Sequence, residues 1–81
     1  MDIEVLLFAA ARESAGRDSI RIQVPDNAVA SDVMEAIEKR LPELAGLIPS
    51  CRLAVDCEYV GAQQEIPAHS ELALIPPVSG G

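Results

Sequence analysis

The sequence predicts one small α+β domain in which a main helix lies across one face of a mixed sheet of about five strands. Apolar residues alternate in several short segments, as in half-buried strands, whereas residues 29–41 repeat them every four positions, as in a helix. The chain has 81 residues, of which 49% are hydrophobic, yet it contains only one Phe and one Tyr. The expected core is therefore small and aliphatic, which excludes a two-domain enzyme.

Residues 2–8 and 18–24 are expected to form the first two strands. Residues 9–16 between them have room for one short helical turn, and Gly16 permits the chain to reverse. This order predicts an antiparallel hairpin. The residues expected on the inward face of these strands are Ile3, Val5, Leu7, Ile20, Ile22 and Val24.

The expected main helix spans residues 29–41 and ends at Pro42, which cannot continue it. Val33, Ile37 and Leu41 should face the sheet because they share one side of the helix. Asn27 and Ser31 both fit the N-terminal cap position, so the start of the helix stays open.

The second half of the chain predicts shorter elements. In order, these are a loose turn at 43–48, a strand at 52–57, a turn or short strand at 58–61, a polar loop at 62–70 and the last strand at 72–75. Within the strand at 52–57, the alternation points Leu53, Val55 and Cys57 inward.

A hairpin, one helix and a last strand that pairs beside the first make up the β-grasp arrangement. In that arrangement one sheet face packs on the helix, and four apolar side chains lie together on the opposite face. Exposed apolar patches of this kind usually mark protein interfaces. The expected patch consists of Leu6, Phe8, Ala73 and Ile75.

The expected domain covers residues 1–75, and residues 76–81 are expected to form an extended arm. Two successive prolines restrict the backbone to extended conformations, which favours a stiff rod. The final glycines lack Cβ atoms and therefore fit a channel too narrow for side chains. The arm consists of Pro76, Pro77, Val78, Ser79, Gly80 and Gly81, with the carboxylate of Gly81 as the reactive group.

The chain offers no machinery to activate that carboxylate. It has no glycine-rich nucleotide-binding motif, and His69, its only histidine, has no nucleophile nearby in the sequence. A carboxylate is a poor electrophile and must first be activated, most simply as a mixed anhydride with a nucleotide. A second protein is therefore expected to act on Gly81, and no metal site is expected.

Charge and cysteine usage argue against several other classes of protein. The net charge of −7 disfavours nucleic acid and favours basic protein partners. Neither a secretory signal nor a membrane span is apparent. Cys51 and Cys57 would lie about 20 Å apart in one extended segment, too far for a disulfide. We therefore expect a cytoplasmic protein with two free thiols.

Residues 72–81 resemble the C-terminus of the small subunits of molybdopterin synthase. That family ends in Pro-Pro-Val/Ile-Ser/Thr-Gly-Gly, and all six positions agree here. Residues 5–13 resemble its first strand and turn, and residues 53–60 resemble its middle. Only the loop at 61–70 differs, since it lacks the usual Gly-Asp type of turn.

The resemblance implies a ubiquitin-like β-grasp protein that is not an enzyme on its own. A separate ATP-dependent adenylyltransferase would adenylate Gly81, which would then be converted to a thiocarboxylate. The large subunit would supply the active site in which this sulfur passes to cyclic pyranopterin monophosphate and forms the dithiolene of molybdopterin. Two copies of each subunit would form a heterotetramer, and this chain would bind no cofactor.

Three alternatives remain open. The chain could be the sulfur carrier of thiamin synthesis, although the tail of that protein generally lacks the double proline. It could also be a protein modifier, joined through Gly81 to lysines of its targets. Finally, it could be an interaction domain with an inert tail.

Overall fold

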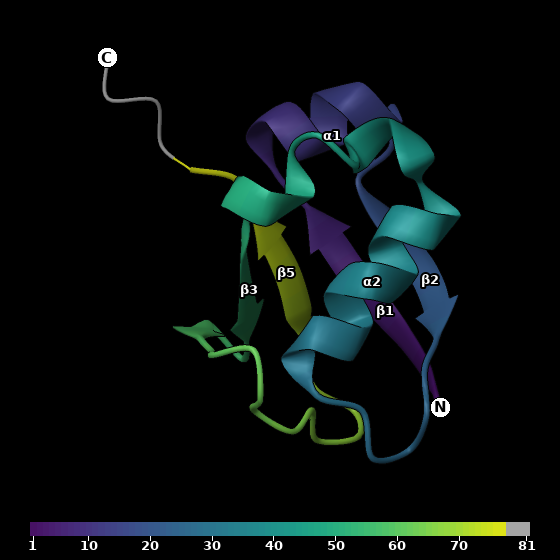
Figure 1. The fold of residues 1–81 in the computed structure, drawn as a ribbon, viewed down its shortest axis with the longest axis vertical. Helices are drawn as coiled ribbons and strands as arrows, with labels where there is room; N and C mark the ends of the chain where they lie inside the picture. Colours follow the sequence, from purple (N-terminus) through teal and green to yellow (C-terminus); the bar gives the residue numbers. More distant parts are fainter. Residues whose placement is uncertain (78–81) are drawn as a thin grey trace.

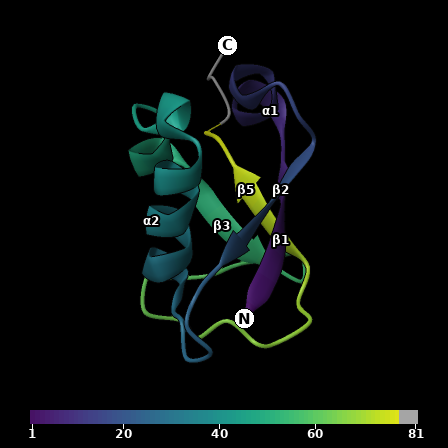
Figure 2. The same ribbon diagram turned by 90° about the vertical axis from the view of Figure 1, so that its right-hand side faces the viewer.

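The computed structural model describes residues 1–77. In chain order the elements are β1 (Asp2–Leu7), α1 (Ala9–Ala15), β2 (Ser19–Gln23), α2 (Ala30–Arg40), the 3₁₀ turns η1 (Pro42–Leu44) and η2 (Ile48–Ser50), β3 (Arg52–Val55), β4 (Glu58–Tyr59) and β5 (Leu72–Ile75). The strands form one sheet in the order β2-β1-β5-β3-β4. Helix α2 lies across one face of this sheet, and α1 lies at the end where β1 and β5 finish (Figures 1 and 2).

The sheet is mixed, because its two central strands run in the same direction. β1 pairs with β5 in parallel and with β2 antiparallel, while β3 pairs antiparallel with both β5 and β4. The predicted hairpin and the predicted pairing of the first and last strands are therefore confirmed. So is the β-grasp arrangement, with one main helix on one face.

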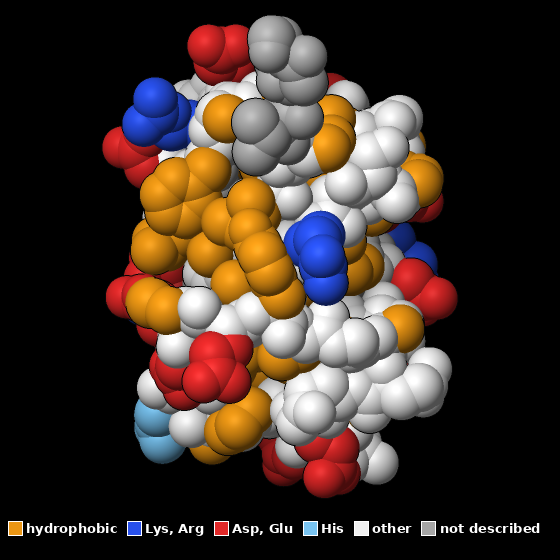
Figure 3. Space-filling view, turned by 90° about the vertical axis from the view of Figure 1, so that its left-hand side faces the viewer, with side chains coloured by type: hydrophobic (Ala, Val, Ile, Leu, Met, Phe, Trp, Pro, Cys, Tyr) orange, Lys and Arg blue, Asp and Glu red, His pale blue; other side chains and the backbone are white. Residues whose placement is uncertain are grey.

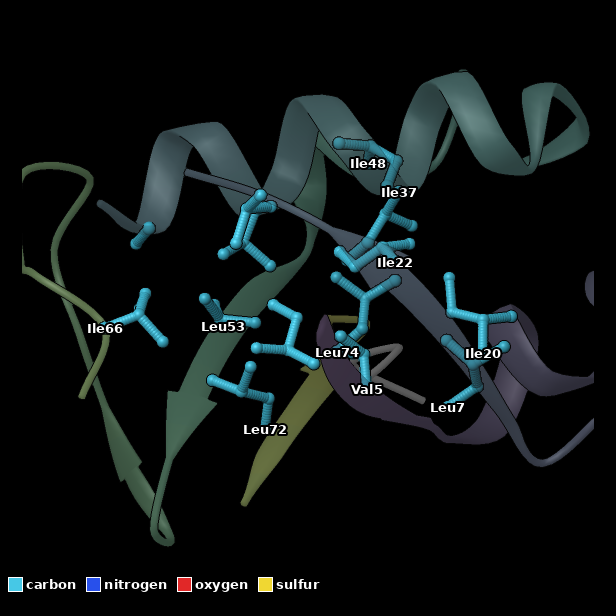
Figure 4. Packing of buried hydrophobic residues seen from close by; sticks show 14 of the residues in the cluster. Val5, Leu7, Ile20, Ile22, Ile37, Ile48, Leu53, Ile66, Leu72 and Leu74 are labelled. Carbon is cyan, nitrogen blue, oxygen red and sulfur yellow. The ribbon is translucent and has the colours of Figure 1, made fainter. Parts of the chain in front are cut away.

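The core lies between the sheet and α2 and is aliphatic, as the composition predicts (Figure 4). All the residues predicted to face inward from the first two strands and from the main helix are buried. Three further large core residues come from segments that were predicted to form turns or a loop. They are Leu44 in η1, Ile48 in η2 and Ile66 in the loop before β5.

Helix α2 begins after Val29, so neither Asn27 nor Ser31 is its cap. A valine side chain cannot accept a hydrogen bond. Instead, the carboxylate of Asp32, one turn into the helix, accepts a hydrogen bond of 3.0 Å from the backbone N–H of Val29. An acid in the first turn also interacts favourably with the helix dipole.

The loop at 61–68 supplies the acceptors that a side-chain cap would otherwise provide. The free N–H groups of Ala30 and Ser31 donate to the carbonyls of Gln64 and Ala62, each at 2.9 Å. Ile66 is buried in the same loop, and its N–H donates to the carbonyl of Ala28. This loop therefore accepts hydrogen bonds from the first N–H groups of α2. Its Ile66 side chain also completes the core near that end of the helix.

Residues 9–15 form a helix of seven residues, longer than the single turn expected there. Ala11 is its buried residue, so the helix covers the end of the sheet with a small side chain. Gly16 ends it with φ of 70°, a left-handed conformation that glycine adopts without strain.

The predicted strand at 52–57 is too long, and the inward orientation of Cys57 is wrong. β3 stops at Val55 because Asp56 and Cys57 have φ of 50° and 71° and form a two-residue turn into β4. Positive φ at both central positions is the requirement of the tight hairpin turn. Cys57 is consequently exposed, and Cys51 is half-buried; both are free thiols.

Candidate docking face

The sheet topology gathers apolar side chains on the face that α2 leaves uncovered. In the register, Leu6 of β1 lies beside Ala73 of β5, and Ala73 lies opposite Ala54 of β3. Tyr59 of β4 lies opposite Ala54 in turn. Since paired residues point to the same face, one apolar row crosses four of the five strands.

A second row lies one pleat closer to the arm. It contains Phe8, which follows β1, and Ile75, which ends β5. Phe8 is 43% exposed and Tyr59 is 57% exposed, which makes them the large hydrophobic residues that the described chain leaves to solvent. The surface view shows apolar side chains gathered in this region (Figure 3).

These residues line a shallow depression of about 230 Å³, which we call the docking face. Its lining residues are Leu6, Phe8, Ala54, Cys57, Tyr59, Glu71, Ala73 and Ile75. All four residues predicted for the patch are among them. Ala54, Cys57 and Tyr59 were not predicted, although the alternation of Ala54 with inward Leu53 and Val55 could have placed Ala54 here.

The base of the arm adjoins the docking face. Pro76 is buried against the domain, whereas Pro77 is exposed. A second hollow, of about 520 Å³, lies between the start of α1 and the end of β5. Phe8 and Ile75 line both hollows, so the docking face is continuous with the surface beside the arm. Val78, Ser79, Gly80 and Gly81 lie outside the described residues.

Charged groups border the docking face. Glu71 lines its depression, and Asp56 lies in the adjoining turn. On the other side, the guanidinium carbon of Arg52 lies 4.6 Å from the centre of the Tyr59 ring. The face is thus an apolar centre with acids along one border and a single stacked arginine along another.

No catalytic set accompanies these groups in residues 1–77. His69 is exposed in the loop before β5, with φ of 64°. Burial raises the pKa of the Cys51 thiol, which lowers its reactivity at neutral pH. In the described part of the chain, no group of three acidic, histidine or cysteine residues is placed to hold a metal ion. None of its helices is long and apolar enough to span a bilayer.

Comparison with known proteins gives concordant results. The model of the ThiS family matches residues 5–81. The molybdopterin synthase sulfur carrier subunit of Dictyostelium discoideum is 37% identical over 81 residues, covering 96% of this chain and 94% of that protein.

Two solved structures extend the comparison. The crystal structure of SAMP1 from Haloferax volcanii superposes with a TM-score of 0.87 at 29% identity over the full length of both chains. A chain from the complex of subunits 1 and 2 of the molybdopterin-converting factor of Helicobacter pylori has a TM-score of 0.70 at 20% identity, again over both full lengths. At that identity the second likeness concerns the fold.

Proposed function

Because this chain belongs to the ThiS family, we propose that it is the sulfur carrier subunit of a molybdopterin synthase. The observation that supports this most directly is the position of the docking face, which adjoins the base of an arm ending in Gly80 and Gly81. A carrier needs both features, a surface that docks on an enzyme and a terminus that enters its active site.

Gly81 is the proposed reactive residue. An oxygen of its carboxylate attacks the α-phosphorus of ATP on a separate adenylyltransferase, and pyrophosphate leaves. Sulfur at the sulfide level then attacks the carbonyl carbon and AMP leaves. The new C–S bond replaces the C–O bond to AMP and gives a thiocarboxylate, with sulfur in place of one oxygen. This chemistry fits a chain whose sequence has no glycine-rich nucleotide-binding motif.

The proposed partner at the docking face is the large subunit of the synthase. The arm, from Pro76 to Gly81, enters its active site and gives sulfur to cyclic pyranopterin monophosphate, which becomes molybdopterin. The Helicobacter pylori chain with the same fold comes from a complex of two such subunits, which supports this assembly. We propose a cytoplasmic heterotetramer with two copies of each subunit, in which this chain binds no cofactor.

Protein modification is a second candidate, favoured by the close match to SAMP1, a small archaeal modifier protein. Both functions begin with activation of Gly81. They differ in the product, because a modifier forms an amide with a lysine of its target, whereas a carrier exchanges oxygen for sulfur. A carrier of thiamin synthesis would also exchange oxygen for sulfur, but it would not form a complex with the large subunit of molybdopterin synthase.

The test combines deletion of Gly81 with intact mass spectrometry. The wild-type chain, purified with its partners, should gain the mass of one oxygen-to-sulfur exchange and should support molybdopterin formation by the large subunit. The deletion variant should dock on the large subunit with near wild-type affinity but transfer no sulfur. Molybdopterin formation by the deletion variant would refute the proposal, and covalent conjugates of the whole chain would favour the modifier.

A further inference from the structure

Arg52 lies at the border of the docking face, and the described residues do not neutralise its charge. It is exposed on β3, opposite Ile75, the residue that precedes the arm. The ion pairs found within residues 1–77 involve the N-terminus and Arg12, so no carboxylate there lies within ion-pair distance of Arg52. The same holds for Arg17, Arg21, Lys39 and Arg40, so what distinguishes Arg52 is its place beside the docking face and its contact with Tyr59.

The ring of Tyr59 orients the guanidinium without neutralising it. The guanidinium carbon lies 4.6 Å from the ring centre, a distance typical of a cation–π contact. Stacking uses the face of the guanidinium and leaves its in-plane N–H groups available to a planar acceptor. An oriented arginine also loses less conformational entropy when it binds.

Arg21 provides the internal comparison. It lies on the same sheet face, on the edge strand β2, and it is exposed like Arg52. In the register Arg21 lies opposite Glu4, and within residues 1–77 no aromatic ring stacks on its guanidinium. Neither arginine lines the docking depression or the hollow beside the arm, but Arg52 stacks on Tyr59, which does line the depression. The two arginines therefore share chemistry and exposure but differ in their position relative to the docking face.

We infer that Arg52 is a specificity-determining contact of the docking face and that it pairs with a carboxylate of the large subunit. This inference rests on the proposed function. Arginine is enriched among the residues that dominate interface energies, and it binds carboxylates through two parallel hydrogen bonds. The matching surface of the large subunit presents an apolar centre to Phe8 and Ile75 and an acidic side chain to Arg52, beside the entrance for the arm.

Calorimetric titration of full-length variants with the large subunit of the same organism tests the inference. Arg52→Gln should weaken binding about tenfold, which corresponds to about 1.4 kcal/mol. Arg52→Lys keeps the charge but loses the planar fork and should weaken binding less. The matched control, Arg21→Gln, removes an equal charge from the same face and should change affinity less than about twofold.

The salt dependence separates an ion pair from a structural role. Added salt screens an exposed ion pair, so the wild type should lose more affinity than Arg52→Gln between low and high ionic strength. Thermal unfolding of each free variant establishes that the domain is intact. Tyr59→Leu removes the ring but keeps the charge of Arg52, so it tests the orienting role of the ring. It should weaken binding about threefold, because the guanidinium is no longer held in place.

Wild-type affinity in Arg52→Gln would overturn the inference. Tighter binding by this variant would overturn it as well, because it would show positive charge on the partner at that position. Equal losses in Arg52→Gln and Arg21→Gln would assign the effect to net charge and would also count against a specific pair. If the wild type itself does not bind the large subunit, the proposed function fails along with the inference.

Discussion

Asp56 and Glu71 are joined by two reciprocal hydrogen bonds. The backbone N–H of Asp56 donates to the carbonyl of Glu71 at 2.8 Å, and a carboxylate oxygen of Asp56 accepts from the backbone N–H of Glu71 at 2.9 Å. The pair ties the turn after β3 to the residue before β5. It therefore holds β3 and β5 together at the end of the sheet where Glu71 borders the docking face.

Replacing Asp56 with Ala should destabilise the domain by about 1–2 kcal/mol. The variant loses the acceptor for Glu71, and it places an alanine at a φ of 50°, which asparagine and aspartate tolerate better. Asp56→Asn, which retains both an oxygen acceptor and this tolerance, is the matched control and should cost less. Urea unfolding measures both variants, and equal stability of Asp56→Ala and wild type would contradict the assigned role.

Ala9 has φ of 49°, an uncommon conformation for a residue with a Cβ atom, at the point where the chain turns from Phe8 into α1. Ala9→Gly should stabilise the domain by about 0.5 kcal/mol, because relief of this strain exceeds the entropic cost of glycine. Ala10→Gly, one position along the helix, should instead destabilise it by about 0.5–1 kcal/mol. Opposite shifts in thermal midpoint are expected, and a parallel loss in both variants would argue against strain at Ala9.

Phe8→Asp and Ile75→Asp should each weaken binding to the large subunit by about 2–4 kcal/mol, because each buries an unpaired charge at a desolvated site. Gln63→Asp, which adds the same side chain at an exposed loop position, should have little effect. Titration calorimetry at fixed salt measures all three. Unchanged affinity in both docking-face variants would exclude this face from the interface.

The two thiols should differ in reactivity towards iodoacetamide. Cys57 is exposed in the turn, whereas Cys51 is half-buried and burial raises the pKa of its thiol. At pH 8 the first alkylation should therefore occur at Cys57, as peptide mass spectrometry would reveal. The rate at Cys51 should rise with pH beyond the range in which an ordinary thiol ionises. Faster labelling of Cys51 would contradict the assigned burial.

The free energy of unfolding should also depend on ionisation of the Cys51 thiol. The pKa of Cys51 is higher in the folded chain than in the unfolded chain, so the unfolded state loses its proton first as pH rises. The contribution of this thiol is fully present below the ordinary thiol pKa and is lost as pH rises through the folded pKa. Cys51→Ala should consequently reduce the loss of stability in this alkaline range.

The sequence was informative wherever one periodicity extended over a whole element. The alternation of Ile3, Val5 and Leu7 predicted β1, and the four-residue spacing of Val33 and Ile37 predicted α2. The predictions failed where tertiary contacts replace local signals. The start of α2 has no capping side chain of the expected kind because loop carbonyls satisfy its N–H groups, and such contacts join residues far apart in the sequence.

The candidate site was predicted to a similar degree. Leu6, Phe8, Ala73 and Ile75 line the docking face, because strand parity and the pairing of β1 with β5 determine their orientation. Tyr59 was missed because its place depends on the tight turn that reverses the chain after β3. The roles of Val78, Ser79, Gly80 and Gly81 stay predictions, since these residues lie outside the part that the structure describes.

The parallel central strands also separate the two ends of the domain. Met1 precedes β1, and Pro76 follows β5 at the opposite end of the strands, about 20 Å away along a strand of six residues (Figure 1). A fluorophore or affinity handle fused ahead of Met1 would therefore be remote from the base of the arm. Immobilisation through that handle would leave the base of the arm accessible, whereas a handle fused after Gly81 would occupy the carboxylate on which the proposed function depends.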